Sequence, residues 1–157
     1  MTQIIFLKCP LGIIKVVADE KGIAEISISD LGEVSVSIPK QLEEVVTQLQ
    51  DYFEGKRNIF NLKLNPKGTD FQKKVWKELL NISFGKTISY LELSKKFGDV
   101  KAIRAVAAAN GKNPLWIVVP CHRVIGTDGS LTGYAGGIWR KKWLLEHENP
   151  TKQQSLF

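Results

Sequence analysis

The first third of the chain carries short β-branched runs separated by turn residues. Runs at 4–7, 13–18 and 23–28 predict strands, and apolar and polar residues alternate at 26–29 and 34–37, as in strands with one buried face. Apolar residues then recur at helical spacing from Leu42 to Phe53, which predicts a helix over that face. Residues 1 to about 62 are therefore expected to form a small α+β unit with an antiparallel sheet.

The rest of the chain predicts mainly helices. The polar stretch 65–68 is the expected linker. Thr69 with Gln72 forms a capping box that opens a helix with an apolar face, and Ser89 with Glu92 forms a second box. The second box opens a short helix that ends at 97–98, directly before another helix at 101–110. Two short helices joined by a glycine-containing turn predict a helix-turn-helix unit.

The helix at 101–110 is unusually poor in side-chain bulk. Arg104 is a single long cation among five alanines: Ala102, Ala105, Ala107, Ala108 and Ala109. Small side chains let a helix backbone approach another surface closely. The alternative is that the alanines pack against a neighbouring helix, and Arg104 tilts the interpretation toward an external surface.

An apolar run at 115–119 predicts a buried strand that ends at Pro120-Cys121-His122-Arg123. Five glycines between 126 and 137 then predict a sharply turning loop, and a last helix is expected from Trp139 to His147. A cysteine beside a histidine and an arginine is a plausible reactive thiolate, because nearby cations lower the pKa of a thiol. Successive strand side chains point to opposite faces, so His122 reaches the sulfur only if the chain turns or a water relays the proton.

An imidazole that acts as a base also needs a partner on its other nitrogen. Glu148 and Asp128 are the candidates, and spacing leaves both open. Cys9 has no basic neighbour and is interpreted as structural. With two cysteines, two histidines and no CxxC pair, neither a disulfide framework nor a closed zinc site is expected.

Composition and charge narrow the function classes. A chain of 157 residues with 43% hydrophobic and 24% charged residues is neither a disordered tail nor a fibre. No apolar run is long enough to span a bilayer, and we expect a cytoplasmic protein with no membrane partner. Residues 1–65 hold 7 basic and 9 acidic residues, whereas residues 66–157 hold 15 and 7. The basic part is the candidate for a polyanion partner.

The motifs together resemble the O6-alkylguanine-DNA alkyltransferases in order and spacing over residues 67–148. They are Phe71-Gln72 with Val75-Trp76, Gly85-Lys86-Thr87 with Ser89-Tyr90, Arg104-Ala105-Val106, Asn113-Pro114, the run from Pro120 to Ile125, Gly133-Tyr134 with Gly136-Gly137, and Leu144-Leu145 with Glu148. The strand pattern before them resembles that family's ribonuclease-H-like domain. The resemblance implies an α+β chain with an N-terminal domain and linker at 1–65, a DNA-binding and alkyl-acceptor domain at 66–150, and a tail at 151–157.

The reaction implied by this resemblance is suicide repair of duplex DNA. The alkyl group of O6-alkylguanine, with alkylated thymine as a further candidate, would pass irreversibly to Cys121 in a single turnover without a cofactor. By the same resemblance His122 deprotonates Cys121 through a water, Glu148 orients His122, Asn113 braces the turn, and Tyr90 donates to the guanine ring. The implied pocket residues are Val124, Tyr134, Ala135 and Lys141.

The helix-turn-helix would enter the minor groove, and Arg104 would fill the gap left by the flipped nucleotide. The implied DNA-binding residues are Lys101, Ala102, Arg104, Ala105 and Arg123, and Lys73, Lys86, Lys95 and Lys96 are further phosphate-contact candidates. Two positions depart from the family. Ala135 stands where some members carry a serine, and the N-terminal part, with Cys9 alone, should lack the zinc ion that certain relatives hold.

Two other functions compete with the alkyl acceptor: a non-catalytic DNA-damage sensor on the same fold, and a thiol hydrolase with a Cys-His-Asn arrangement. The sensor function is weakened because a non-catalytic protein would not need a cysteine at position 121. The hydrolase function leaves the alanine-rich helix without a purpose. A monomer is expected. Gln153, Ser155, Leu156 and Phe157 resemble the bacterial sliding-clamp-binding peptide, although Gln154 departs from the favoured leucine.

Overall fold

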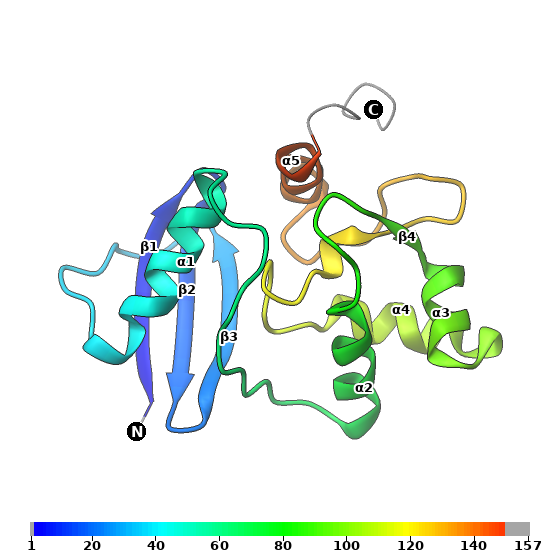
Figure 1. Cartoon of the computed structure of the whole chain (residues 1–157), viewed down its shortest axis with the longest axis horizontal. Coiled ribbons are helices and arrows are strands. Elements are labelled where there is room, and N and C mark those ends of the chain that lie inside the picture. Colours follow the sequence, from blue (N-terminus) through cyan, green and yellow to red (C-terminus); the bar gives the residue numbers. More distant parts are fainter. Residues whose placement is uncertain (1, 150–157) are drawn as a thin grey trace. The chain divides into compact units, whose positions relative to one another are not determined.

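The computed structural model describes residues 2–149 (Figure 1). By its internal contacts the chain divides into two compact units. Of the described residues, the first comprises 2–67 together with Pro114–Val118, and the second comprises Gly68–Asn113 and 119–149. The domain boundaries expected from the sequence put residues 114–118 in the second domain. In the structure, the contacts of this segment group it with the first unit.

The first unit is an antiparallel sheet with one helix on its face. Strands β1 (Gln3–Cys9), β2 (Gly12–Asp19) and β3 (Gly22–Ser29) lie in the order β1-β2-β3. A 3-10 turn, η1 (Lys40–Leu42), leads into α1 (Glu43–Phe53), which lies across the sheet (Figure 1). The predicted sheet and helix are confirmed. The shared core contains Ile5, Ile14, Val16, Ile26 and Leu49, each at most 1% exposed.

The alternating segment 34–37 was predicted to be a strand, and this is wrong. Val36 is fully exposed, and the segment forms hydrogen bonds with β1 through Ser35, whose N–H donates to the carbonyl of Phe6 and whose hydroxyl accepts from the N–H of Phe6. Gly32, at a φ of 124°, turns the chain against Phe6 and Ile13. A single residue in register cannot extend a ladder, so the alternation does not produce a strand.

The outer edge of β3 carries two single-residue bridges. Ile23 pairs with Leu64, and Ile26 pairs with Leu115, whose neighbours Pro114 and Trp116 exchange backbone hydrogen bonds with Ile26. The strand predicted at 115–119 is therefore wrong beyond Leu115. The chain turns at Ile117, which has a φ of 72°, although Leu115 to Val119 is largely buried. Its apolar character reports burial and not an extended backbone.

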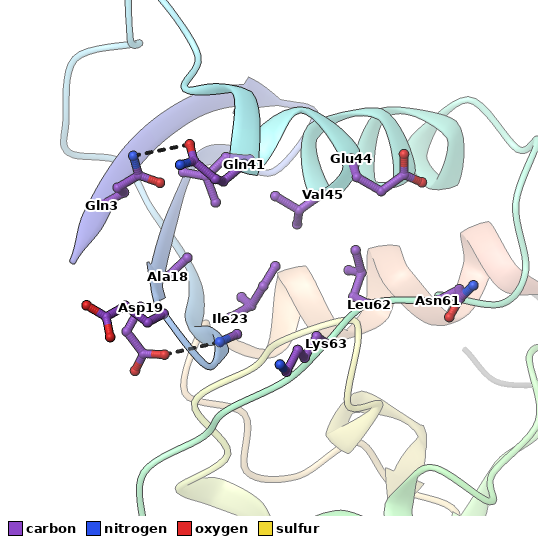
Figure 2. A pocket seen from close by; sticks show the side chains of 13 residues that line it. Gln3, Ala18, Asp19, Ile23, Gln41, Glu44, Val45, Asn61, Leu62 and Lys63 are labelled. Carbon is purple, nitrogen blue, oxygen red and sulfur yellow. Dashed lines mark hydrogen bonds between the residues drawn. The ribbon is translucent and has the colours of Figure 1, made fainter. Parts of the chain in front are cut away.

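A pocket of about 590 Å³ lies in the first unit, between the ends of the strands and the start of α1 (Figure 2). Its apolar lining includes Ala18, Ile23 and Val45, and Gln3 donates to Gln41 across 3.5 Å at its edge. None of the residues that line it belongs to the predicted site.

The second unit is mainly helical. Helix α2 (Asp70–Leu79) and helix α3 (Tyr90–Phe97) both start at capping boxes, at Thr69 with Gln72 and at Ser89 with Glu92, as predicted. Gly98, at a φ of 100°, ends α3. A 3-10 turn, η2 (Val100–Ala102), leads into α4 (Ile103–Gly111), which completes the predicted helix-turn-helix. Strand β4 (Ile88–Ser89) pairs in parallel with β5 (Val124–Ile125), and α5 (Ile138–Glu148) is the last helix.

Some alanines of α4 pack against a neighbouring helix, and others lie on an exposed surface. Ala109 is buried, and its carbonyl accepts a 2.8 Å hydrogen bond from the indole N–H of Trp76 on α2. Ala105 and Ala108 are exposed on the same side as Arg104. One side of α4 is thus fixed to the unit, and the other is a small-residue surface with one long cation.

Candidate active site

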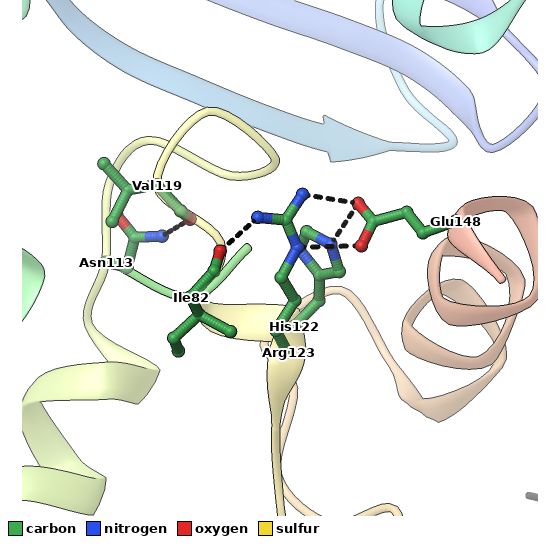
Figure 3. A network of polar contacts seen from close by, with 6 residues as sticks. All are labelled: Ile82, Asn113, Val119, His122, Arg123 and Glu148. Atoms are coloured by element: carbon green, nitrogen blue, oxygen red, sulfur yellow. Dashed lines mark hydrogen bonds and ion pairs between the residues drawn. The ribbon is translucent and has the colours of Figure 1, made fainter. Parts of the chain in front are cut away.

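A one-turn 3-10 helix, η3 (Cys121–Arg123), follows Pro120 and carries the candidate nucleophile. The N–H of Cys121 donates to the carbonyl of Val119 at 2.8 Å, and the side-chain amide of Asn113 donates to the same carbonyl at 2.8 Å (Figure 3). Asn113 is 3% exposed. The chain therefore turns at the cysteine, and Asn113 braces that turn from the segment after α4.

His122 lies wholly buried beside the end of α5 (Figure 3). Its Nε2 atom is 2.8 Å from Oε2 of Glu148, and its Nδ1 atom has no hydrogen-bond partner among the described residues. Asp128, the other candidate, accepts hydrogen bonds from Ser130 in an exposed loop. Glu148 is therefore the carboxylate that holds His122.

Arg123 is not placed to contact DNA, so the prediction of a phosphate contact is wrong. The residue is 6% exposed, and its guanidinium donates to both carboxylate oxygens of Glu148, at 2.8 and 3.0 Å. Its remaining nitrogen, Nη1, donates to the carbonyl of Ile82 at 2.7 Å. The sequence suggested a basic surface residue, but the 3-10 turn points this side chain at a buried carboxylate.

Burial would raise the pKa of Glu148, but the charge of His122 and the hydrogen bonds from His122 and Arg123 outweigh it and hold the pKa far below its ordinary value. Glu148 is 5% exposed. The carboxylate therefore stays ionised throughout the physiological range.

Cys121 is 5% exposed, and burial raises the pKa of its thiol to about 11, although a hydrogen bond from Asn113 and the charge of Lys141 act in the opposite direction. The resting sulfur is consequently a protonated thiol at neutral pH. Nucleophilic chemistry at this site requires a base at the moment of reaction.

Lys141 is buried among backbone oxygens in the glycine-rich loop. Its Nζ donates to the carbonyls of Val124 and Thr132, at 2.6 and 2.8 Å. Burial lowers its pKa to about 8, while the neighbouring Cys121 acts to raise it. The lysine thus ties the loop to β5 and places a cation near the sulfur.

Tyr90 is half-buried at the first turn of α3, and its hydroxyl donates to the carbonyl of Thr132 at 3.4 Å. Burial, with a smaller contribution from Cys121, raises the pKa of this phenol, and the same two causes raise that of Tyr134 well above its ordinary value. Both phenols therefore keep their protons. Ala135, next to Tyr134, is exposed, and Val124 is buried at the start of β5.

Asn110 was not predicted as a site residue. It is 2% exposed, its amide donates to the carbonyl of Cys121 at 3.5 Å, and it forms a hydrogen bond with Tyr90. A polar residue on the otherwise apolar last turn of α4 was the available signal.

The predicted DNA-facing residues other than Arg123 lie along η2 and the start of α4. Lys101, Arg104 and Ala105 are exposed, and Ala102 is half-exposed. Lys73, Lys86, Lys95 and Lys96 are also exposed on the second unit. Within residues 2–149, no cluster of three or more His, Cys, Asp or Glu side chains could hold a metal ion, and no helix is long and apolar enough to cross a membrane.

Two family models match the chain. The model of the 6-O-methylguanine DNA methyltransferase DNA-binding domain matches residues 70–150, and the model of its ribonuclease-like domain matches residues 4–66. The methylated-DNA–protein-cysteine methyltransferase of Methanosarcina barkeri is 44% identical over 149 residues, which cover 90% of this chain and 94% of that protein.

Solved structures match the whole fold. The crystal structure of the Mycobacterium tuberculosis O6-methylguanine methyltransferase has a TM-score of 0.86 at 39% identity, covering 96% of this chain and 94% of its own. That of the M. tuberculosis protein OGT in complex with DNA has a TM-score of 0.83 at 40% identity and covers 97% of both chains.

Proposed function

The chain belongs to the 6-O-methylguanine DNA methyltransferase family, and from this premise we propose that it repairs alkylated duplex DNA by moving an alkyl group from guanine O6 to its own Cys121. The observation that carries the proposal is the buried Cys121 on a 3-10 turn, followed by His122 in contact with the ionised Glu148. The relative from Methanosarcina barkeri is a methylated-DNA–protein-cysteine methyltransferase by name, and one of the similar M. tuberculosis structures is a complex with DNA.

Activation begins at the thiol. Because Glu148 holds Nε2 of His122, Nδ1 is the nitrogen that takes the proton of Cys121, through a bridging water. The hydrogen bond from Asn113 and the charge of Lys141 favour the resulting thiolate. These groups offset the burial that keeps the resting thiol protonated.

The thiolate then attacks the alkyl carbon as the bond from that carbon to O6 breaks, and the bonding electrons pass to the guanine. Tyr90 stays protonated because burial raises the pKa of its phenol, so it is suited to donate a hydrogen bond to the ring as negative charge develops there. The guanine leaves with the proton that the thiol lost, and Cys121 becomes a stable thioether. Each molecule therefore reacts once.

The exposed side of α4 is the proposed DNA surface. Ala105 and Ala108 would allow close approach to the minor groove, and Arg104 would enter the duplex in place of the flipped nucleotide. Phosphate contacts by the exposed lysines would supply most of the affinity, which should fall as salt rises.

A stoichiometric assay tests this function. The protein is mixed with an excess of duplex containing one radiolabelled O6-methylguanine, and label on protein is counted against protein present. One methyl per molecule, and none on Cys121→Ser, supports the proposal. A sensor would bind the duplex without transfer, and a thiol hydrolase would neither bind nor accept label.

We also propose a monomer in the cytoplasm, and a sliding-clamp contact through Gln153, Ser155, Leu156 and Phe157, which lie outside the described residues. A synthetic peptide of residues 150–157 tests the contact. Loss of clamp binding on replacing Leu156 and Phe157 by alanine is expected, and a peptide that does not bind where known clamp peptides do would end this proposal.

A further inference from the structure

Arg123 connects two segments with different roles in the proposed reaction: the end of α5, which carries Glu148, and the chain that leads from Ile82 to Tyr90. On one side its guanidinium grips both oxygens of Glu148, the carboxylate that also holds His122 (Figure 3). On the other side it donates to the carbonyl of Ile82, after the end of α2. The chain runs from Ile82 into β4 and directly to Tyr90.

The segment after Ile82 is fixed to the end of α5 at further points. The side chain of Asn149 donates to the carbonyl of Gly85 at 2.9 Å, and a Cβ atom on Gly85 would stand only 3.3 Å from the carbonyl oxygen of Glu148. The Arg123 guanidinium also lies over the ring of Phe84, 5.8 Å from its centroid. Residues 82–85 thus wrap the end of α5 with Arg123 between them.

The fork geometry matters for Glu148. A carboxylate that is gripped through both oxygens by one guanidinium has its plane fixed, and Oε2 can then present its other lone pair to His122. A lysine ammonium would keep the charge but lack the planar fork that fixes the carboxylate through both oxygens.

We infer that Arg123 is a positioning residue of the alkyl transfer: it sets the orientation of Glu148, and through it His122, and ties this pair to the segment that delivers Tyr90. The inference rests on the proposed function. Arg123 contacts neither substrate nor sulfur in this role, and it makes no contribution to DNA affinity.

The first test separates rate from binding in Arg123→Lys. We expect the single-turnover rate at saturating methylated duplex to fall by roughly 10- to 100-fold. Removal of a residue that orients a metal-binding side chain in a metalloenzyme has an effect of this size. The Kd for the duplex and its salt dependence should stay unchanged. A phosphate contact would instead weaken binding and reduce the salt slope by about one, with the saturated rate kept.

Arg57→Lys is the matched control, because Arg57 also lies beside a carboxylate, Asp51 at 3.9 Å, and donates to a backbone carbonyl, that of Ile59. Neither rate nor affinity should change in it. A folded Arg123→Lys with the wild-type rate, or with weakened DNA binding, would overturn the inference.

A double-mutant cycle tests whether Arg123 acts through Glu148. If it does, Arg123→Met added to Glu148→Gln should slow transfer far less than the product of the two separate effects, because the second change removes an already broken contact. Arg123→Lys, which leaves no unpaired buried carboxylate, takes the place of Arg123→Met in the cycle if Arg123→Met alone does not fold. Multiplicative effects would contradict the inference.

An activity-independent readout separates this inference from the proposed function. The ionised and titratable groups near Glu148 are His122, Arg123 and Tyr134. Because its folded pKa is depressed, Glu148 contributes stability that is present above its unfolded pKa and lost as the pH falls below it. The loss of thermal stability on acidification should be smaller in Arg123→Lys than in wild type. If the loss of thermal stability on acidification is the same in Arg123→Lys and wild type, Arg123 does not position Glu148. If the wild-type protein transfers no methyl group, the proposed function is wrong, and this measurement still tests the contact.

Discussion

The Nε2 atom of His122 lies 2.8 Å from Oε2 of Glu148, although 26 positions separate the two residues in the sequence. The contact joins the turn that carries Cys121 to the last turn of α5. Folding of the second unit therefore assembles the base beside the candidate nucleophile.

Replacing Glu148 by glutamine should slow methyl transfer. Glutamine keeps the size but loses the charge that stabilises the protonated imidazole of His122, so we expect the single-turnover rate to fall by roughly 100-fold or more, the contribution of general-base catalysis. Glu146→Gln is the control, because Glu146 lies on the same helix and pairs only weakly with Lys142, at 3.9 Å. Equal rates in Glu148→Gln and wild type would show that the carboxylate has no part in the reaction.

The thiol of Cys121 should titrate near pH 11, the value to which burial raises its pKa. Thiolate absorbance, taken as the difference between wild type and Cys121→Ser, measures this directly. Asn113→Ala should move the midpoint higher, because the hydrogen bond from Asn113 lowers this pKa. Lys142→Met, at an exposed side chain, should leave the midpoint in place. A midpoint near the ordinary thiol value would contradict the burial of the sulfur.

The raised pKa of Cys121 also has a consequence for stability. A folded pKa above the unfolded value of 9.0 contributes stability that is full below that value and is lost as the pH rises toward about 11. The free energy of unfolding should therefore fall less steeply over this window in Cys121→Ser than in wild type. Urea unfolding at several alkaline pH values measures the difference, and parallel curves would contradict the prediction.

Adding bulk to the exposed side of α4 should weaken binding to duplex DNA. Ala105 is exposed beside Arg104, so Ala105→Leu leaves the core untouched but holds the helix away from the groove. We expect the Kd to rise by roughly 10-fold or more, equivalent to the loss of about 1.4 kcal/mol. Thr47→Leu adds bulk at an exposed position of α1 and should leave the Kd unchanged. Undiminished binding by Ala105→Leu would place the DNA elsewhere.

Trp76→Phe should destabilise the second unit without abolishing its chemistry. The change removes the 2.8 Å hydrogen bond to the carbonyl of Ala109, which still accepts from the N–H of Lys112, so we expect a cost of about 0.5–1.5 kcal/mol. Chemical denaturation measures the loss. A free energy of unfolding equal to that of wild type would show that this contact between α2 and α4 contributes nothing.

Local chemistry in the sequence predicted much of this fold. Both capping boxes open helices where expected. In the pairs Thr69 with Gln72 and Ser89 with Glu92, the two side chains accept hydrogen bonds from the free backbone N–H groups of the helix start, so no residue distant in the sequence is needed. The sequence failed where the outcome depends on distant partners. Val34 to Ser37 alternates like a strand but has one residue in register with β1, and Leu115 to Val119 is buried without being extended.

The candidate site shows the same division. The run from Pro120 to Arg123 indicated a turn with a reactive cysteine, but spacing alone left Glu148 and Asp128 open as partners of His122. Only the packing of α5 against the turn selects Glu148 and points Arg123 inward, to a carboxylate that is distant in the sequence. The sequence predicted that the Arg123 guanidinium contacts DNA, whereas in the structure it is buried against Glu148.

The mass of the peptide that contains Cys121, measured after the protein has reacted with duplex DNA bearing one O6-methylguanine, tests alkyl transfer to this sulfur without any intermediate assumption. We expect this peptide to gain a single methyl group on sulfur, while the peptide with Cys9 and all peptides from Cys121→Ser remain unmodified. An unmodified Cys121 peptide recovered alongside repaired DNA would contradict alkyl transfer to Cys121.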